Sequence, residues 1–141
     1  AFMVSLFVFL LRRAVSYDAI HVHLAGSPAL PACLAGRILG KPVVVKLGGR
    51  AMTMSGFGWH KRAVPPGSVE LAAAMAPYYE TCIEHFGAAR CMFESNFPMD
   101  RVACSYTILW NAFKRVTQAY PQAERLALFH DTATRVYRLN R

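Results

Sequence analysis

The sequence predicts an α/β fold in which parallel strands alternate with helices. Two stretches of strand composition, 19–24 and 42–47, flank a helical pattern within about 30 residues, and that order predicts a right-handed parallel βαβ unit. The composition, 55% hydrophobic and 17% charged, excludes a disordered, fibrous or coiled-coil chain. The 141 residues suffice for one modest domain but not for a complete eight-stranded α/β barrel, which needs about 200 or more.

The first predicted element is a helix over residues 2–15. The run from Phe2 to Leu11 is apolar except for Ser5, and two arginines follow it. A helix needs about 20 apolar residues to span a bilayer. We therefore expect a buried or interfacial helix and no membrane span.

Residues that commonly begin or end helices and strands mark the boundaries of the βαβ unit. Ser27 is predicted to cap the helix and Pro28 to occupy its first position, while Gly40 ends it in the left-handed conformation. The following strand, 42–47, is strongly β-branched, and a Gly-Gly pair stops it.

The remaining chain predicts a long loop followed by mostly helical structure. The loop covers residues 48–67, and a helix over 68–86 contains Pro77, which should kink it. Its predicted core face consists of Leu71, Met75, Tyr78, Cys82 and Phe86. After a short strand at 90–94, we predict helices over 105–120 and 121–129, and a last turn capped by Asp131. The core face of the 105–120 helix is predicted to be Leu109, Trp110, Phe113 and Val116.

Charge and cysteine content indicate which partners and which cellular compartment to expect. The net charge is +8, but no run of three basic residues exists, so we expect solvated surface charge and no nucleic-acid partner. The four cysteines form no C-x-x-C pair, which favours reduced, buried thiols in a cytoplasmic protein.

The most specific candidates for a functional site are two histidines in the first predicted strand and the residues at the end of the third. His21 and His23 lie two apart in a strand, so they share a face. They either bind one Zn²⁺ together or divide between packing and a contact to a substrate oxygen. Glu94 and Asn96 also share a face, at the carboxyl end of a strand, where function gathers in parallel α/β folds.

The loop after the second strand can fold over this end and bring a histidine to it. The predicted site is made of catalytic and substrate-binding side chains, without a metal ligand. The catalytic candidates are His60, Glu94, Asn96 and Asp100, and the substrate-binding candidates are Lys46 and Trp59.

Residues 43–139 resemble the C-terminal part of the amidohydrolase-related, metal-dependent hydrolases. The resemblance is carried by stretches such as Val43–Gly49, Gly56–His60, Arg90–Pro98 and Leu128–Leu139. It implies part of a TIM barrel, its late strands and C-terminal helices, preceded here by the βαβ unit. It also implies a divalent metal such as zinc in the family, and a lactone or carboxylate-bearing small-molecule substrate.

The sequence departs from that family's pattern in the Arg90–Pro98 stretch, where Glu94 stands in place of the usual glycine. Asn96 stands where the family commonly has an aspartate, and a neutral amide binds a divalent cation weakly beside a carboxylate. We therefore expect no cofactor, and a site that binds an anion or polyol through His60, Lys46 and Asn96.

Residues 9–49 resemble a different family, the N-terminal lobe of family-4 glycosyltransferases of the GT-B fold. This resemblance rests on Leu10–Arg13, Tyr17–Pro28 and Ala35–Lys46. It divides the chain into a glycosyltransferase-like segment, 1–49, and an amidohydrolase-like segment, 43–141. The two resemblances together predict a chimera joined at 43–49. Either recombination or an error of sequence assembly would produce such a chimera.

These resemblances imply a hydrolase fragment of the lactone or C–N/C–C bond class with little or no activity alone. The alternatives are a glycosyltransferase remnant and a non-catalytic α/β module that buries its exposed edge in a homo-oligomer.

Overall fold

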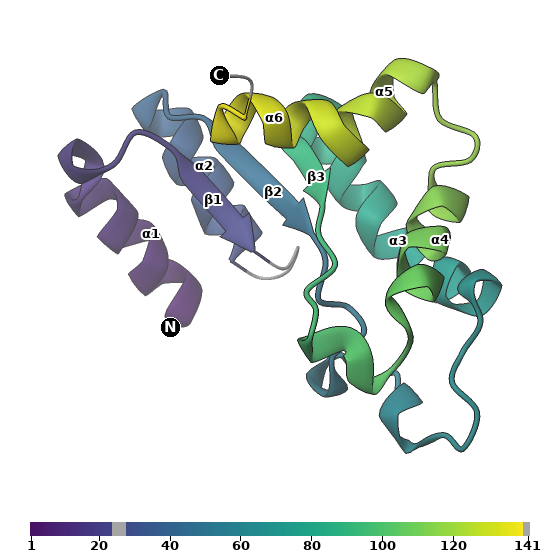
Figure 1. The fold of residues 1–141 in the computed structure, drawn as a ribbon. Coiled ribbons are helices and arrows are strands. Elements are labelled where there is room, and N and C mark those ends of the chain that lie inside the picture. The colour runs from purple at the N-terminus through teal and green to yellow at the C-terminus, as the bar shows by residue number, and fades with distance from the viewer. Residues whose placement is uncertain (24–27, 140–141) are drawn as a thin grey trace.

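A three-stranded parallel sheet forms the centre of the structure, a computed structural model that describes residues 1–23 and 28–139. Its order is β1 (Ile20–His23), β2 (Val43–Leu47) and β3 (Cys91–Phe93). β1 runs parallel to β2, and β2 parallel to β3, which confirms the predicted βαβ unit (Figure 1).

The helices follow the predicted order; the helix over 68–86 has the predicted bounds, and the others differ at one or both ends. They are α1 (Phe2–Arg12), α2 (Ala29–Leu39), α3 (Ser68–Phe86), α4 (Tyr106–Val116), α5 (Gln122–Leu126) and α6 (Thr132–Tyr137). α2 ends at Leu39, and its C-cap Gly40 has a φ of 63°, which confirms the left-handed cap. The predicted cap at Ser27 lies outside the described residues. No described helix has the length and hydropathy to cross a membrane.

Helices α2 and α3 cover one face of the sheet. The other, which we call the open face, is covered only in part, by the C-terminal helical segment over β3, where Met92 is buried. An added Cβ on Gly36 of α2 would meet Val43 at 2.3 Å, so α2 lies against the face that carries Ile20, Val43 and Val45. Tyr79 of α3 contacts Phe93 with ring centroids 5.9 Å apart, which places α3 on the same face. The alternation in β1 is strict, with buried Ile20 and Val22 and exposed histidines between them.

Two predicted core faces are shifted. α3 buries Tyr79 and Ile83, whereas Tyr78 is 43% exposed and Cys82 is half-buried. The steps of four residues from Leu71 through Met75 to 79 and 83 keep the stripe toward the sheet, so the prediction chose neighbours one position early. On α4, Ala112 is buried and Trp110 is half-buried.

The C-terminal helices join without the predicted cap. A π-helical turn, Ala127–Asp131, connects α5 to α6. Asp131 has helical backbone angles and caps nothing, because its carboxylate lies 2.8 Å from Nδ1 of His130. The helix therefore continues through the position where we predicted a new start.

The cysteines are reduced, and two of them are fully buried. Burial raises the pKa of the Cys91 thiol to about 12 and that of Cys104 to about 11. Cys33 and Cys82 are only half-buried. The two buried thiols remain protonated at neutral pH and are poor nucleophiles.

Candidate functional site

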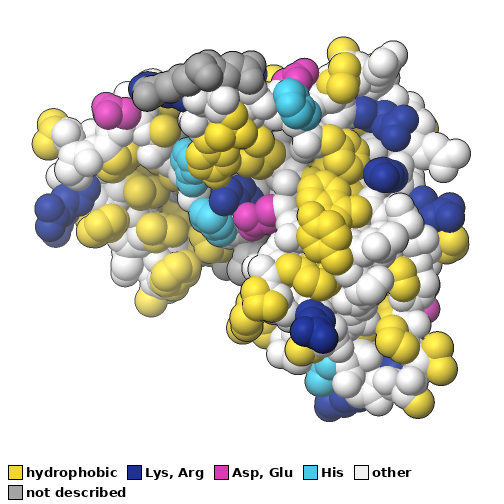
Figure 2. Space-filling view, viewed as in Figure 1, with side chains coloured by type: hydrophobic (Ala, Val, Ile, Leu, Met, Phe, Trp, Pro, Cys, Tyr) yellow, Lys and Arg dark blue, Asp and Glu magenta, His cyan; other side chains and the backbone are white. Residues whose placement is uncertain are grey.

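Ionisable side chains from β1, from β2 and from the residue after β3 meet on the open face of the sheet. The register pairs His23 with Lys46, and Lys46 with Met92. The Glu94 N–H donates to the Leu47 carbonyl at 3.2 Å, so Glu94 continues β3 on the same face. Figure 2 shows histidine, basic and acidic side chains adjoining one another over this face.

Glu94 is the centre of this group, which we call the open-face cluster (His23, Lys46 and Glu94). Its Oε2 lies 3.4 Å from Nζ of Lys46, and its Oε1 lies 3.8 Å from Nδ1 of His23. The side chains of Lys46 and Glu94 are 20% and 23% exposed, so water screens their attraction less than at a free surface. A carboxylate is thereby held between a cation and an imidazole.

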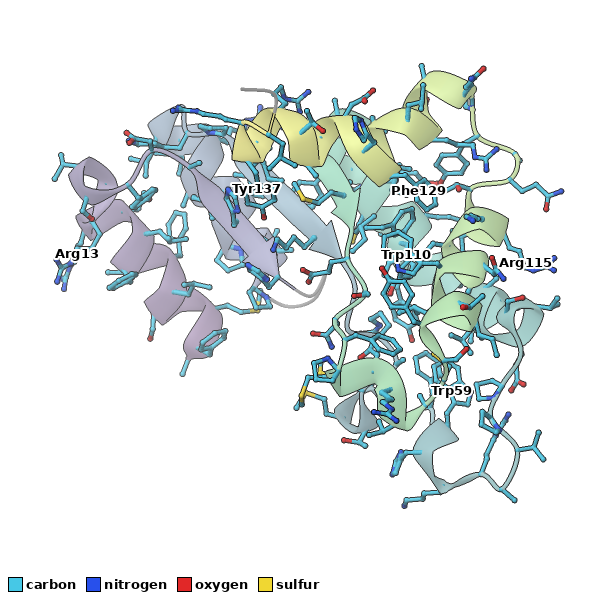
Figure 3. The ribbon with its side chains drawn as sticks, viewed as in Figure 1. Arg13, Trp59, Trp110, Arg115, Phe129 and Tyr137 are labelled. Atoms are coloured by element: carbon cyan, nitrogen blue, oxygen red, sulfur yellow. The ribbon has the colours of Figure 1, made fainter. Side chains whose placement is uncertain are left out.

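Tyr137 of α6 covers one side of the cluster (Figure 3). Its ring centroid lies 5.5 Å from Nζ of Lys46 and 5.9 Å from the His21 ring. Burial lowers the pKa of Lys46, but Tyr137 and Glu94 outweigh it, and the pKa is raised overall. Lys46 is therefore a permanent cation at neutral pH.

His21 lies on the same face, but its surroundings disfavour its charged form, whereas those of Lys46 favour the charged form. Partial burial lowers the pKa of its imidazole, and the neighbouring Lys46 and His23 lower it further. Since the usual value is 6.5, His21 is uncharged at neutral pH and is available as a hydrogen-bond donor or acceptor.

Asn96 and Asp100 form a second, adjoining pair after β3. Asn96 adopts a left-handed backbone with φ of 52°, and its Nδ2 donates to Oδ1 of Asp100 at 2.8 Å. Asp100 is completely buried. Burial raises the pKa of Asp100, and hydrogen bonds from Asn96 and the Ala51 backbone offset that rise only in part.

The buried Asp100 makes stability depend on pH. Because the pKa is higher in the folded protein than its usual 3.8, the folded state holds the proton more tightly than the unfolded state. The contribution of Asp100 to stability is therefore greatest below the usual pKa and is lost as the pH rises through the raised one. We expect Asp100→Asn to remove this decline, measured as the free energy of unfolding in urea between pH 3.5 and 7. A decline of equal size in the variant would contradict the assignment to Asp100.

The structure does not bring the other two predicted site residues to this group. Trp59 is buried, and it stacks on Phe57 with ring centroids 4.3 Å apart, at the end of the molecule away from Tyr137 (Figure 3). His60 is exposed. Among the described residues, no hydrogen bond or ion pair links His60 to Lys46 or Glu94.

Sequence reasoning recognised the residues of the open-face cluster only in part. Lys46 and Glu94 were predicted, and the two-residue spacing of His21 and His23 was read correctly as one face. The pairing of His23 with Glu94 depends on the register of β1 and β2. Tyr137 had no local signal, because its contact with Lys46 joins positions 91 residues apart.

The donor set is poor for a metal ion. Within residues 1–23 and 28–139, no three His, Cys, Asp or Glu side chains are grouped so that they could hold one.

Comparison with known proteins shows the family to which this chain is similar. A family model described as amidohydrolase matches residues 20–139. Two crystal structures of an amidohydrolase from Burkholderia multivorans, one with bound zinc and one with bound HEPES, are 24% and 23% identical, with TM-scores of 0.70 and 0.69. Each match covers 96% of this chain and 49% of the solved chain.

One curated relative is similar over part of the chain. The uncharacterized protein y4mH of Sinorhizobium fredii is 48% identical over 66 residues, which are 47% of this chain and 22% of the relative. The matched residues thus span about a fifth of this relative, and the chain spans about half of the solved structures.

The predicted glycosyltransferase resemblance of residues 9–49 is not supported. The amidohydrolase match begins at residue 20 and runs through 43–49 without a break. The parallel pairing of β1 with β2 is common to many α/β folds, so the strand–helix–strand pattern did not discriminate between the two families.

Proposed function

The chain belongs to the amidohydrolase family, and from that premise we propose that its open-face cluster binds the substrate of a small-molecule hydrolase. The observation that carries this proposal is the Glu94 carboxylate held 3.4 Å from the Lys46 ammonium and 3.8 Å from the His23 imidazole. The substrate class we propose is a lactone, whose hydrolysis yields a carboxylate-bearing acid.

The cluster has the groups that such a hydrolysis requires. The Lys46 ammonium stabilises the carbonyl oxygen as it gains negative charge, and Glu94 accepts a proton from the attacking water. The water oxygen bonds to the carbonyl carbon, the ring C–O bond breaks, and the proton passes from Glu94 to the departing alkoxide.

The residues of this chain do not fit the zinc that the Burkholderia multivorans structure carries. A Lys46 ammonium 3.4 Å from Glu94 repels a divalent cation from the carboxylate that would bind it. Asn96 offers only a neutral amide oxygen, which binds a divalent cation weakly beside a carboxylate. We therefore derive no step through a metal, and Lys46 supplies the positive charge of the site.

We also propose that the chain alone has little or no turnover. Its three strands are taken as consecutive strands of a barrel, in which the open face would be the interior. The described strands enclose no such interior, so water reaches the cluster from one side and weakens its electrostatic interactions.

The test is binding of gluconate, the acid product of a sugar lactone, measured by calorimetry with the whole chain. We expect Lys46→Met to weaken binding at least tenfold, because the ammonium is lost. Glu94→Gln is expected to strengthen binding, because the carboxylate no longer competes for Lys46. Lys114→Met, an exposed lysine of α4, is the matched control and should bind as the original chain does.

Two results would contradict the proposal. One is gluconate binding that is absent, or that is unchanged in Lys46→Met. The other is rapid lactone hydrolysis that requires added Zn²⁺ and is lost in both His60→Ala and Glu94→Gln, since that would place a metal and His60 at the reaction.

A further inference from the structure

Helix α1 exposes an apolar face that no other described part of the chain covers. Phe2, Val4 and Phe9 are 63%, 67% and 57% exposed, and none of the helix's residues is buried. The opposite side packs against the core through Phe7, Leu10 and Leu11. The helix is therefore anchored on one side and apolar on the side that faces water.

Positive charge lies beside this apolar face. Val4, Val8 and Phe9 line one shallow depression together with Arg12 and Arg13, and Figure 3 shows Arg13 at the C-terminal end of α1. Residues 1–17 contain no acidic side chain. The surface thus combines large apolar groups with guanidinium groups that form no ion pair with any side chain of residues 1–23 and 28–139, and guanidinium groups bind phosphate well.

We propose that α1 lies in the surface of an anionic lipid bilayer. Its apolar face enters the boundary between headgroups and acyl chains, and Arg12 and Arg13 bind lipid phosphates, as amphipathic interfacial helices do. Its 11 residues span about 17 Å, too short to cross the bilayer core of about 30 Å. The helix therefore lies along the surface.

Charge favours lipid over a second copy of the chain as the occupant of this face. Two copies that met through α1 would bring Arg12 and Arg13 near their counterparts, and each copy carries a net charge of +8. An anionic bilayer attracts the same charges.

Co-sedimentation of the whole chain with vesicles tests the proposal. We expect it to bind vesicles of phosphatidylglycerol and phosphatidylcholine, and to remain in solution with phosphatidylcholine alone. The Arg12→Gln and Arg13→Gln double variant is expected to lower the partition coefficient more than tenfold, at about fivefold for each charge. Phe9→Glu is expected to abolish binding.

Two control variants on other surfaces distinguish binding through α1 from nonspecific binding to vesicles. Val64→Glu removes a side chain that is 77% exposed, and Arg101→Gln removes an exposed charge. Both are expected to bind vesicles as the original chain does. Circular dichroism checks that each variant folds.

Two outcomes would overturn the proposal. The first is equal binding to charged and uncharged vesicles, or loss of binding in the controls as well. The second is a dimer in lipid-free analytical ultracentrifugation that Phe9→Glu converts to a monomer, because α1 would then bind a second copy. These readouts do not involve turnover, so they are independent of the proposed hydrolase function.

Discussion

Phe113→Ala is expected to destabilise the protein by about 3–5 kcal/mol, the usual cost of removing a buried phenylalanine. Phe113 of α4 is completely buried. Its ring stacks on Phe93 of β3 at 4.5 Å and meets Tyr79 of α3 edge-on at 5.7 Å. One side chain thus joins a strand to two helices, and alanine would leave a cavity between all three.

Urea unfolding measures this loss, and Tyr106→Ala is its matched control. Tyr106 is an aromatic residue of the same helix, but it is 53% exposed, so we expect a cost below about 1.5 kcal/mol. Equal losses in the two variants would mean that the α4 packing described here is wrong.

Gly48→Ala is expected to cost about 3 kcal/mol and to displace Glu94. A Cβ at position 48 would lie 2.4 Å from both Cγ and the backbone oxygen of Glu94. The backbone oxygen cannot rotate away as a side chain can, so the backbone segments at positions 48 and 94 must separate. Overpacking of this kind costs about 1–3 kcal/mol or more. The separation strains the hydrogen bond from the Glu94 N–H to the Leu47 carbonyl.

The displacement is expected to appear in ligand binding as well as in stability. Gluconate binding should strengthen while the free energy of unfolding falls, because a displaced Glu94 carboxylate competes less for Lys46. Gly67→Ala is the control, since nothing lies within 4 Å of its added Cβ, and a change of at most about 1 kcal/mol is expected there. If Gly48→Ala matched this control in both measurements, the close contact with Glu94 would be refuted.

Local patterns predicted the order of the elements because they depend on neighbours in sequence. The β-branched run at 43–47 and the glycine at position 40 act within a few residues, and the structure has the strand and the left-handed cap there. The core face of α3 was predicted less well, because a choice between Tyr78 and Tyr79 depends on where the sheet lies.

The candidate site was predicted only where its members are local. Glu94 and Asn96 follow one strand, and Asn96 with Asp100 is a contact between positions four apart. His60 and Trp59 were assigned because their loop can reach the strand ends, but Trp59 is instead buried against Phe57. Which of several apolar groups a loop buries depends on the free space in the core.

The sequence by itself determined the alternation of strands and helices and the shared face of His21 and His23, since both follow from backbone periodicity. Only the tertiary structure decided that His23 and Lys46 meet Glu94, and that Tyr137 lies over Lys46. Strand register sets the first contact, and helix docking sets the second. Both join distant segments through packing of the whole chain, which no local pattern records.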